Sequence, residues 1–206
     1  TGAREIGYMF GQYKRLRNEW SGVLTGKGLT YGGSLARTEA TGFGLCYFTN
    51  EMLKANGKSF KDQTVVISGS GNVAIYATKK ATEFGAKVVA LSDSNGYVYD
   101  PDGIELEIVQ QIKEVERGRI KEYVDRTSHK NATYTEGCKG IWSIKCDIAL
   151  PCATQNEIDG ESAKLLAENG CYAVSEGANM PSTPEAIDVY FANNMLYGPA
   201  KACLLY

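Results

Sequence analysis

The stretch "TVVISGSGNVAIYATKKATEFGAKVVALSDSNG" (Thr64–Gly96) combines residue types and spacings that suit phosphate binding. Its motif Gly69-x-Gly71-x-x-Ala74 follows a β-branched apolar run and opens a helical pattern. Gly69 permits a tight turn, Gly71 lets backbone N–H groups approach a pyrophosphate, and the small Ala74 lets the helix pack close to its strand. The helix N-terminus then faces the phosphates. The motif predicts a dinucleotide site, with a glycine turn in some other α/β domain as the alternative.

The residues after the second apolar run indicate which dinucleotide is bound. Asp93 lies about 20 residues beyond the glycines, where a lone acid favours the free 2′-hydroxyl of NAD. Ser92 and Ser94 flank it, and their hydroxyl groups can donate to the 2′-phosphate of NADP. A later basic cluster can add positive charge, unless it is an ordinary solvated helix face: Lys113, Arg117, Arg119 and Lys121. NADP is therefore preferred, and NAD stays possible.

The elements that must position these residues alternate along the chain. Strands are expected over residues 64–68, 87–91, 148–150, 172–175 and 195–197. Helices are expected over residues 1–18, 38–55, 72–83, 104–116, 160–169 and 184–193, with a basic helical piece through residues 119–124. Strands separated by such helices predict a parallel sheet with right-handed crossovers. The expected fold class is α/β, a Rossmann-type doubly wound, mostly parallel sheet with helices on both faces.

Composition excludes several other functions. The chain has 206 residues, 43% of them hydrophobic, and a formal net charge of -2, so no basic excess indicates nucleic acid. No apolar run is long enough to span a membrane, and the first residues do not show the charged-then-apolar pattern expected of a leader. No G-x-x-x-x-G-K-[ST] motif of an ATP-binding P-loop occurs.

Cysteine and histidine usage argues against a metal site. The six cysteines show no C-x-x-C spacing, so we expect reduced and mostly buried thiols in a cytoplasmic protein. His129 is the single histidine and lies in a polar run, where a solvated loop position is expected. One histidine removes most histidine metal sites and most Ser-His or Cys-His nucleophiles.

Six glycine-rich or polar stretches resemble, in order, the glutamate dehydrogenase family, specifically the cofactor half of its hexameric, mostly NADP-linked microbial members. The resemblance covers nearly the whole chain, from Thr1 to about Ala202. The stretches are "LTGKG", "GGSLARTEATGFG", "SGSGNVA", "DIALPCATQNEI", "EGANMPST" and "GPAKA".

The resemblance implies a set of cofactor contacts. Phosphates would be bound at the glycine motif, by Gly69, Ser70, Gly71, Asn72 and Val73. The adenosine ribose and its 2′-phosphate would be contacted by Ser92, Asp93, Ser94, Lys113 and Arg119. The nicotinamide half would be contacted by Thr41, Ala153, Thr154 and Asn179.

The activity implied by the resemblance is reversible hydride transfer, in which L-glutamate, NADP and water give 2-oxoglutarate, ammonium and NADPH. The family's catalytic lysines and aspartate precede the "GAREIGYMF" helix, so no catalytic residue is assigned here. Both ends look cut, and we expect a fragment of a homohexameric parent that turns over little by itself. Residues 1–56 would link to a missing substrate domain and residues 57–206 would bind the dinucleotide. A leucine or phenylalanine dehydrogenase, and a non-catalytic dinucleotide-binding module, remain alternatives.

Overall fold

The computed structural model describes residues 3–35, 37–200 and 202. The predicted helix start at Thr1 and the thiol of Cys203 lie outside these residues. The chain divides into two compact units, Thr1–Ala40 and Thr41–Tyr206. The domain boundary expected at residues 56 and 57 concerns a longer protein and stays a prediction.

The smaller unit is built around one aromatic cluster. Helix α1 (Ala3–Arg17) and the short 3-10 helix η1 (Leu29–Tyr31) are its regular elements. Phe10 is 1% exposed, and its ring centroid lies 5.3 Å from that of Trp20 and 5.9 Å from that of Tyr31. This cluster fixes α1 against the loop that follows it.

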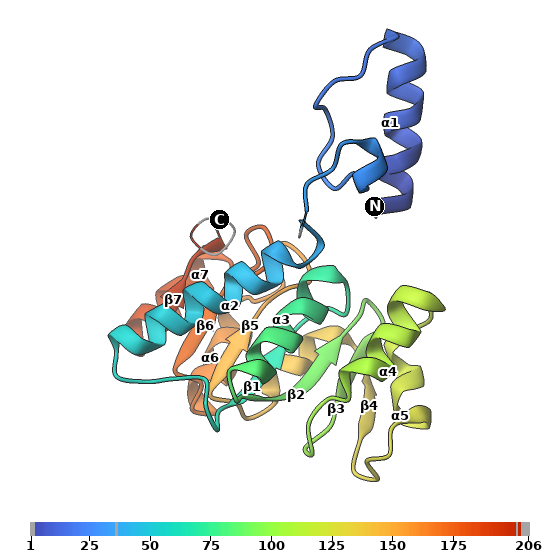
Figure 1. Ribbon diagram of the computed structural model, residues 1–206. Coiled ribbons are helices and arrows are strands. Elements are labelled where there is room, and N and C mark those ends of the chain that lie inside the picture. Colours follow the sequence, from blue (N-terminus) through green and yellow to red (C-terminus); the bar gives the residue numbers. More distant parts are fainter. Residues whose placement is uncertain (1–2, 36, 201, 203–206) are drawn as a thin grey trace. The chain divides into compact units, whose positions relative to one another are not determined.

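The larger unit contains a seven-stranded sheet in the order β4-β3-β2-β1-β5-β6-β7 (Figure 1). The β1–β2, β1–β5, β5–β6 and β6–β7 pairs are parallel, whereas β2–β3 and β3–β4 are antiparallel. The expected α/β class with a mostly parallel sheet is confirmed. The strands are β1 (Thr64–Ile67), β2 (Lys87–Ser92), β3 (Gly96–Tyr99), β4 (Thr133–Glu136), β5 (Ile148–Leu150), β6 (Ala173–Ser175) and β7 (Leu196–Gly198).

Helices cover both faces of this sheet, α2 and α3 on one and α6 and α7 on the other (Figure 1). Alternation along β1 serves both layers, because Val65 and Ile67 join the first core cluster and Val66 the second. The helical elements are α2 (Arg37–Ala55), α3 (Asn72–Glu83), α4 (Leu106–Gln110), η2 (Gln111–Val115), η3 (Ile120–Glu122), α5 (Tyr123–Arg126), η4 (Cys138–Ser143), α6 (Gly160–Glu168) and α7 (Pro184–Ala192).

The structure differs from the sequence-based prediction between β2 and β5. Strands β3 and β4 were not predicted, and they extend the sheet as an antiparallel edge. The single helix expected over residues 104–116 begins at Leu106 and becomes a π-helix at Gln111. The basic piece after it is a 3-10 turn followed by the four residues of α5. Neither strand is a continuous buried apolar run like those of β1, β2 and β5, so the sequence pattern did not reveal them.

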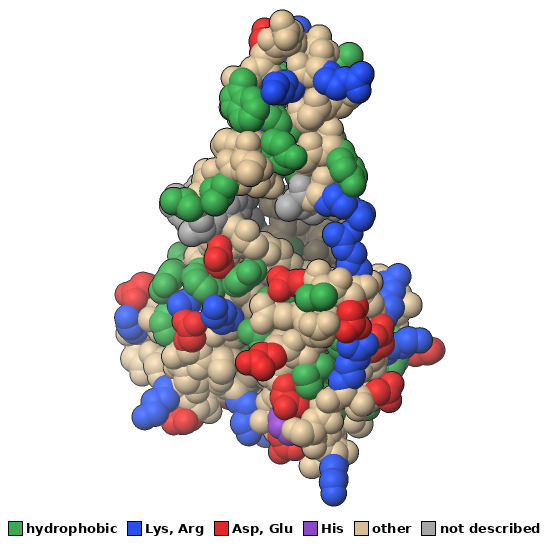
Figure 2. Space-filling model, turned by 45° about the vertical axis from the view of Figure 1, so that its right-hand side comes forward, with side chains coloured by type: hydrophobic (Ala, Val, Ile, Leu, Met, Phe, Trp, Pro, Cys, Tyr) green, Lys and Arg blue, Asp and Glu red, His purple; other side chains and the backbone are tan. Residues whose placement is uncertain are grey.

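The surface of the larger unit carries interspersed acidic and basic side chains on the face shown in Figure 2. No helix within the described ranges is long and apolar enough to cross a membrane. Among the described cysteines, Cys138 is exposed and the other four are buried as free thiols: Cys46, Cys146, Cys152 and Cys171.

Candidate functional site

The glycine motif lies where the strand order reverses. The chain runs from β1 to β2 on one side, and β5 pairs with the other side of β1. Gly69 follows β1 with φ +85°, a left-handed conformation that glycine adopts without strain. Its N–H donates to Ser92 Oγ at 2.8 Å, and Ser92 is 2% exposed. The buried Ser92 hydroxyl therefore stabilises the glycine turn.

Gly71 is the N-cap of α3 and leaves the start of the helix open. As a glycine it supplies no side-chain cap, and no acidic residue lies in the first turn of the helix. A Cβ at Gly71 would meet no protein atom within 4 Å. The helix spans 12 residues and directs its positive end toward this space. An anionic ligand group fits here, because no acidic side chain of the first turn occupies the site and the ligand can approach the backbone closely.

The loops after β1, β5 and β6 meet at this point. We call residues 68–71, 151–159 and 176–183 the switch-point loops. A Cβ at Gly69 would lie 3.2 Å from the Cys152 carbonyl oxygen and 3.3 Å from Ala153 Cα. A Cβ at Gly177 would lie 2.6 Å from Cys152 Sγ and 3.3 Å from Val73 Cγ1. Glycine at both positions therefore permits the loops to pack against one another.

Helix α2 presses directly on α3 beside the same turn. A Cβ at Gly42 would lie 2.6 Å from the Ala77 backbone nitrogen and 2.8 Å from the Val73 carbonyl oxygen. Thr41, the residue before it, is half-buried on α2. Thr41 therefore lies in sequence beside the contact of α2 with α3, and its contact with the nicotinamide half of a cofactor stays a prediction.

The carboxylate of Asp93 accepts hydrogen bonds from two backbone N–H groups, one in its own loop and one at η3. Its Oδ1 accepts from the Asn95 N–H at 2.9 Å, and its Oδ2 accepts from the Ile120 N–H at 3.0 Å. The side chain is only 7% exposed. Both oxygens are therefore engaged, which leaves Asp93 poorly placed to select a free ribose 2′-hydroxyl.

Two basic groups gather beside Asp93. Lys113 Nζ lies 4.0 Å from Asp93 Oδ2 and donates to the Gly118 carbonyl at 2.9 Å. The Arg119 guanidinium donates to Ser94 Oγ at 3.0 Å and is exposed. We call Ser94, Lys113 and Arg119 the basic corner. Its net positive charge and its open guanidinium suit a phosphate group.

The remaining predicted site residues lie on the switch-point loops and at the start of α3. Asn72, Ala153, Thr154 and Asn179 are exposed, Val73 is half-buried, and Ser70 is 3% exposed. These positions are compatible with ligand contact for the exposed groups, and the contacts themselves stay predictions.

Two acids in the loops were missed by reasoning from the sequence. Glu157 accepts from the N–H groups of Ala153 and Thr154, at 3.0 and 3.2 Å. Glu176 is 3% exposed and accepts from the N–H groups of Ser182 and Ala200, at 3.2 and 2.9 Å. An acid directly after a short strand of small and apolar residues, as in "AVSEG", is the signal that could have revealed Glu176.

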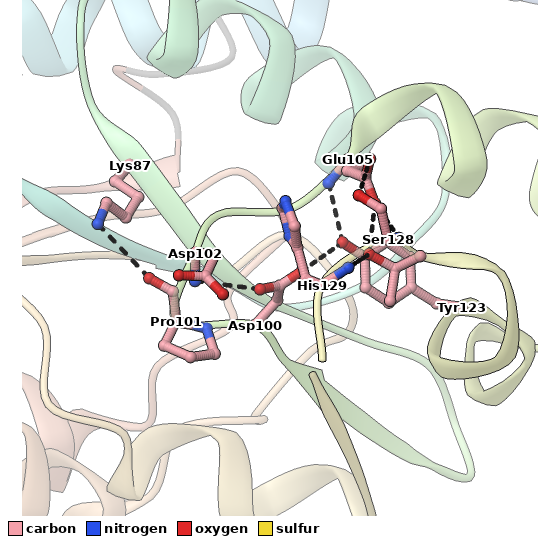
Figure 3. Close-up of polar contacts among 9 residues, drawn as sticks. Lys87, Asp100, Pro101, Asp102, Glu105, Tyr123, Ser128 and His129 are labelled. Carbon is pink, nitrogen blue, oxygen red and sulfur yellow. Dashed lines mark hydrogen bonds and ion pairs between the residues drawn. The ribbon is translucent and has the colours of Figure 1, made fainter. Parts of the chain in front are cut away.

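His129 is not the solvated loop residue that was expected. Its Nδ1 lies 2.7 Å from Oδ2 of the fully buried Asp100, which also accepts from the Tyr123 hydroxyl at 2.6 Å (Figure 3). The hydrogen bond to Asp100 raises the pKa of His129, against a smaller opposing effect of burial. The ligand atoms of Asp100, Asp102 and His129 lie close enough together to hold one metal ion. The Asp100 oxygens are already occupied, however, so the group forms an ion-paired network that holds α5 against the end of β3.

Comparison with known proteins agrees with this geometry. Residues 32–203 match the profile of the glutamate/leucine/phenylalanine/valine dehydrogenase family. The chain belongs to this family.

Several glutamate dehydrogenases resemble this family member closely. A glutamate dehydrogenase of Bacteroides thetaiotaomicron is 54% identical over 205 residues, which are 98% of this chain and 45% of the relative. An NADP-specific glutamate dehydrogenase of Helicobacter pylori is 54% identical over 98% of the chain and 46% of the relative. The crystal structure of Plasmodium falciparum glutamate dehydrogenase aligns with a TM-score of 0.90 at 50% identity, over 98% of this chain and 44% of that one. The chain thus spans less than half the length of the relatives it matches.

Proposed function

We propose that this chain is the dinucleotide-binding part of an NADP-dependent glutamate dehydrogenase. The longer enzyme would interconvert L-glutamate, NADP and water with 2-oxoglutarate, ammonium and NADPH. The observation that carries the proposal is the open N-terminus of α3 behind the turn Gly69–Gly71, at the reversal of strand order. Dinucleotides bind at this point in doubly wound sheets.

The described residues fit such a ligand in three parts. The start of α3, from Gly69 to Val73, would hold the pyrophosphate through backbone N–H groups. The basic corner would hold the 2′-phosphate, with Asp93 and Ser92 shaping the loop and turn beside it. The side of β5 and β6 would hold the nicotinamide half, contacted by Thr41, Ala153, Thr154 and Asn179.

The chemistry at the reacting carbon belongs to the bound ligand, since a nicotinamide ring exchanges a hydride with the α-carbon of the amino acid. The residues of this chain would bind and orient the dinucleotide, and hydride transfer needs carbons within about 3–3.5 Å. We assign no catalytic residue to this chain. Closure against the remaining part of the longer enzyme would complete the reacting geometry.

The choice of NADP rests on the basic corner. Relatives at 50–54% identity carry NADP-specific, NAD(P)-specific and NAD-specific names, so family membership alone does not choose. Asp93 has both carboxylate oxygens engaged, and Arg119 is exposed above it. This arrangement favours a phosphate over a free hydroxyl.

The assembly and location of the longer enzyme are also proposals. We propose a homohexamer that acts on small molecules in the cytoplasm, consistent with the free thiols of the described cysteines. A Thermus thermophilus glutamate dehydrogenase described as hetero-hexameric is 24% identical, and this likeness supports the fold alone.

The test is a fluorescence titration of the protein with NADPH and with NADH. Arg119→Ala should weaken NADPH binding about tenfold, or about 1.4 kcal/mol, and leave NADH binding unchanged. Lys164→Ala, on the exposed side of α6, is the matched control. A preference of the parent protein for NADH of about tenfold or more would contradict the proposed cofactor.

A further inference from the structure

Glu157, in the switch-point loop after β5, is the centre of a polar network. Its Oε1 accepts from the N–H groups of Ala153 and Thr154, which therefore point toward the acid. The Ser68 hydroxyl, at the end of β1, bonds to the Glu157 carboxylate and accepts from the Cys152 N–H at 2.9 Å. Glu157 thus couples the loop after β5 to the strand that leads into the glycine turn.

Glu176 performs a similar task one strand further along. Its Oε1 accepts from the Ser182 N–H and its Oε2 from the Ala200 N–H, so one carboxylate joins the far end of the loop after β6 to the segment after β7. The near end of the loop is fixed separately, because the Gly177 and Ala178 N–H groups both donate to the Pro151 carbonyl, at 2.9 and 3.0 Å. The loops after β5 and β6 are therefore tied together as one unit.

The two acids are close enough to affect one another. Burial raises the pKa of Glu157, and the charge of Glu176 raises it further. Two neighbouring buried carboxylates are unfavourable unless donors compensate them. Here the donors are backbone N–H groups of the loops themselves, so each carboxylate holds the loop segments that solvate it.

These hydrogen bonds make the two sides of the switch point differ in the backbone N–H groups that they offer to a ligand. The amides of Ala153 and Thr154 face an acid, whereas the N-cap of α3 is a glycine, which supplies no side-chain cap. These two amides on the β5 side are therefore already engaged and are not offered to a second anion. If the adenosine half lies over β2, beside the basic corner, the nicotinamide ring and its ribose, which carry no negative charge, lie over β5 and β6.

We propose that Glu157 and Glu176 are positioning residues that fix the loops after β5 and β6 for the nicotinamide half of the dinucleotide. The inference rests on the proposed dinucleotide-binding function and deepens it. It assigns the two acids to one half of the ligand, so their loss should affect ligands that reach across β1 and spare those confined to the β2 side.

The experiment is calorimetric titration with two probes, NADP+ and adenosine 2′,5′-bisphosphate, which lacks the nicotinamide half. Glu157→Ala should raise the Kd of NADP+ at least about tenfold and change that of the bisphosphate less than about twofold. Glu157→Gln keeps an oxygen that accepts from both amides, so NADP+ binding should recover to within about threefold of the parent. Glu168→Ala, an exposed acid at the end of α6, is the control and should bind both probes as the parent does.

An equal loss for both probes, or no loss for NADP+, would overturn the inference. If Glu157→Ala does not fold, Glu176→Gln is titrated with the same two probes. The NH2 group of the glutamine cannot accept a hydrogen bond, so one of the bonds from the Ala200 and Ser182 N–H groups would be lost. A selective loss of NADP+ binding supports the inference, and an equal or absent loss overturns it. Failure of the parent protein to bind either probe would instead refute the proposed function.

Discussion

Replacing Gly71 by Ala should separate the fold of the glycine turn from its binding role. Gly71 has φ −88° and ψ −168°, which an alanine adopts, and its Cβ would meet no protein atom within 4 Å. Alanine is a poorer N-cap than glycine, which should lower the free energy of unfolding by about 0.5–1 kcal/mol. Alanine also reduces the conformational entropy of the unfolded chain, which should raise the free energy of unfolding by about 0.4–1 kcal/mol. The free energy of unfolding should therefore change by less than about 0.5 kcal/mol.

Binding should respond far more strongly to the same change. The added methyl group would occupy the space through which a pyrophosphate approaches the first turn of α3. Loss of a single hydrogen bond to a charged group costs about 1.5–3 kcal/mol, so the Kd of NADP+ should rise about tenfold or more. Thermal unfolding and fluorescence titration on the same sample measure the two effects.

Two comparison variants complete this design. Gly11→Ala, in α1, also meets open space and should leave NADP+ binding unchanged. Gly69→Ala combines φ +85° with atoms of Cys152 and Ala153 at 3.2–3.3 Å, so it should destabilise the fold by about 1–3 kcal/mol. NADP+ binding by Gly71→Ala at the strength of the parent would show that the turn is not the phosphate site.

Three further predictions concern stability. Gly42→Ala should lower the free energy of unfolding by about 1–3 kcal/mol in urea titration, because its Cβ would press on the Val73 and Ala77 backbone; a stability equal to that of the parent would contradict the close contact of α2 and α3. Tyr123→Phe should cost about 1–3 kcal/mol by the same measurement, because the hydroxyl donates to buried Asp100 and accepts from the Glu105 N–H; an unchanged midpoint would count against this network. The raised pKa of His129 means that its ion pair stabilises the fold fully below about pH 6.5, the ordinary pKa, and that this contribution is lost as pH rises through the folded pKa. Melting curves of the parent and His129→Asn should therefore converge as pH rises, and a constant difference would refute this account.

The regular part of the sheet was predictable because its signals are local. Helix α3 and strand β5 have the predicted bounds, Asn72–Glu83 and Ile148–Leu150. The antiparallel edge was missed because β3 is buried only at alternate positions and β4 is a polar strand with little buried surface, so neither forms a continuous apolar run. Such strands owe their existence to pairing with neighbours rather than to their own pattern.

The candidate site was predictable to a different extent. The glycine turn follows from spacing, whereas Lys113 and Arg119 were selected from a longer basic cluster by the family resemblance. The structure brings Ser94 and Arg119 into contact across 25 residues of chain. The partners of His129 and Glu157 could not be inferred in this way. Asp100 lies 29 residues before His129, and the Glu157 carboxylate meets Ser68 only because β1 and β5 are neighbours. Tertiary pairing of distant residues decides these contacts.

The polar strand β4 has a consequence for solubility during folding. It is an edge strand of the sheet, and Thr133, Thr135 and Glu136 are exposed along its four residues. Short, polar edge strands discourage another chain from adding a strand to the sheet by backbone hydrogen bonding. Removal of residues 130–137 would uncover β3, which contains the fully buried Val98, and would present an apolar border to other molecules. The least conspicuous strand of the sheet thus protects the rest from self-association.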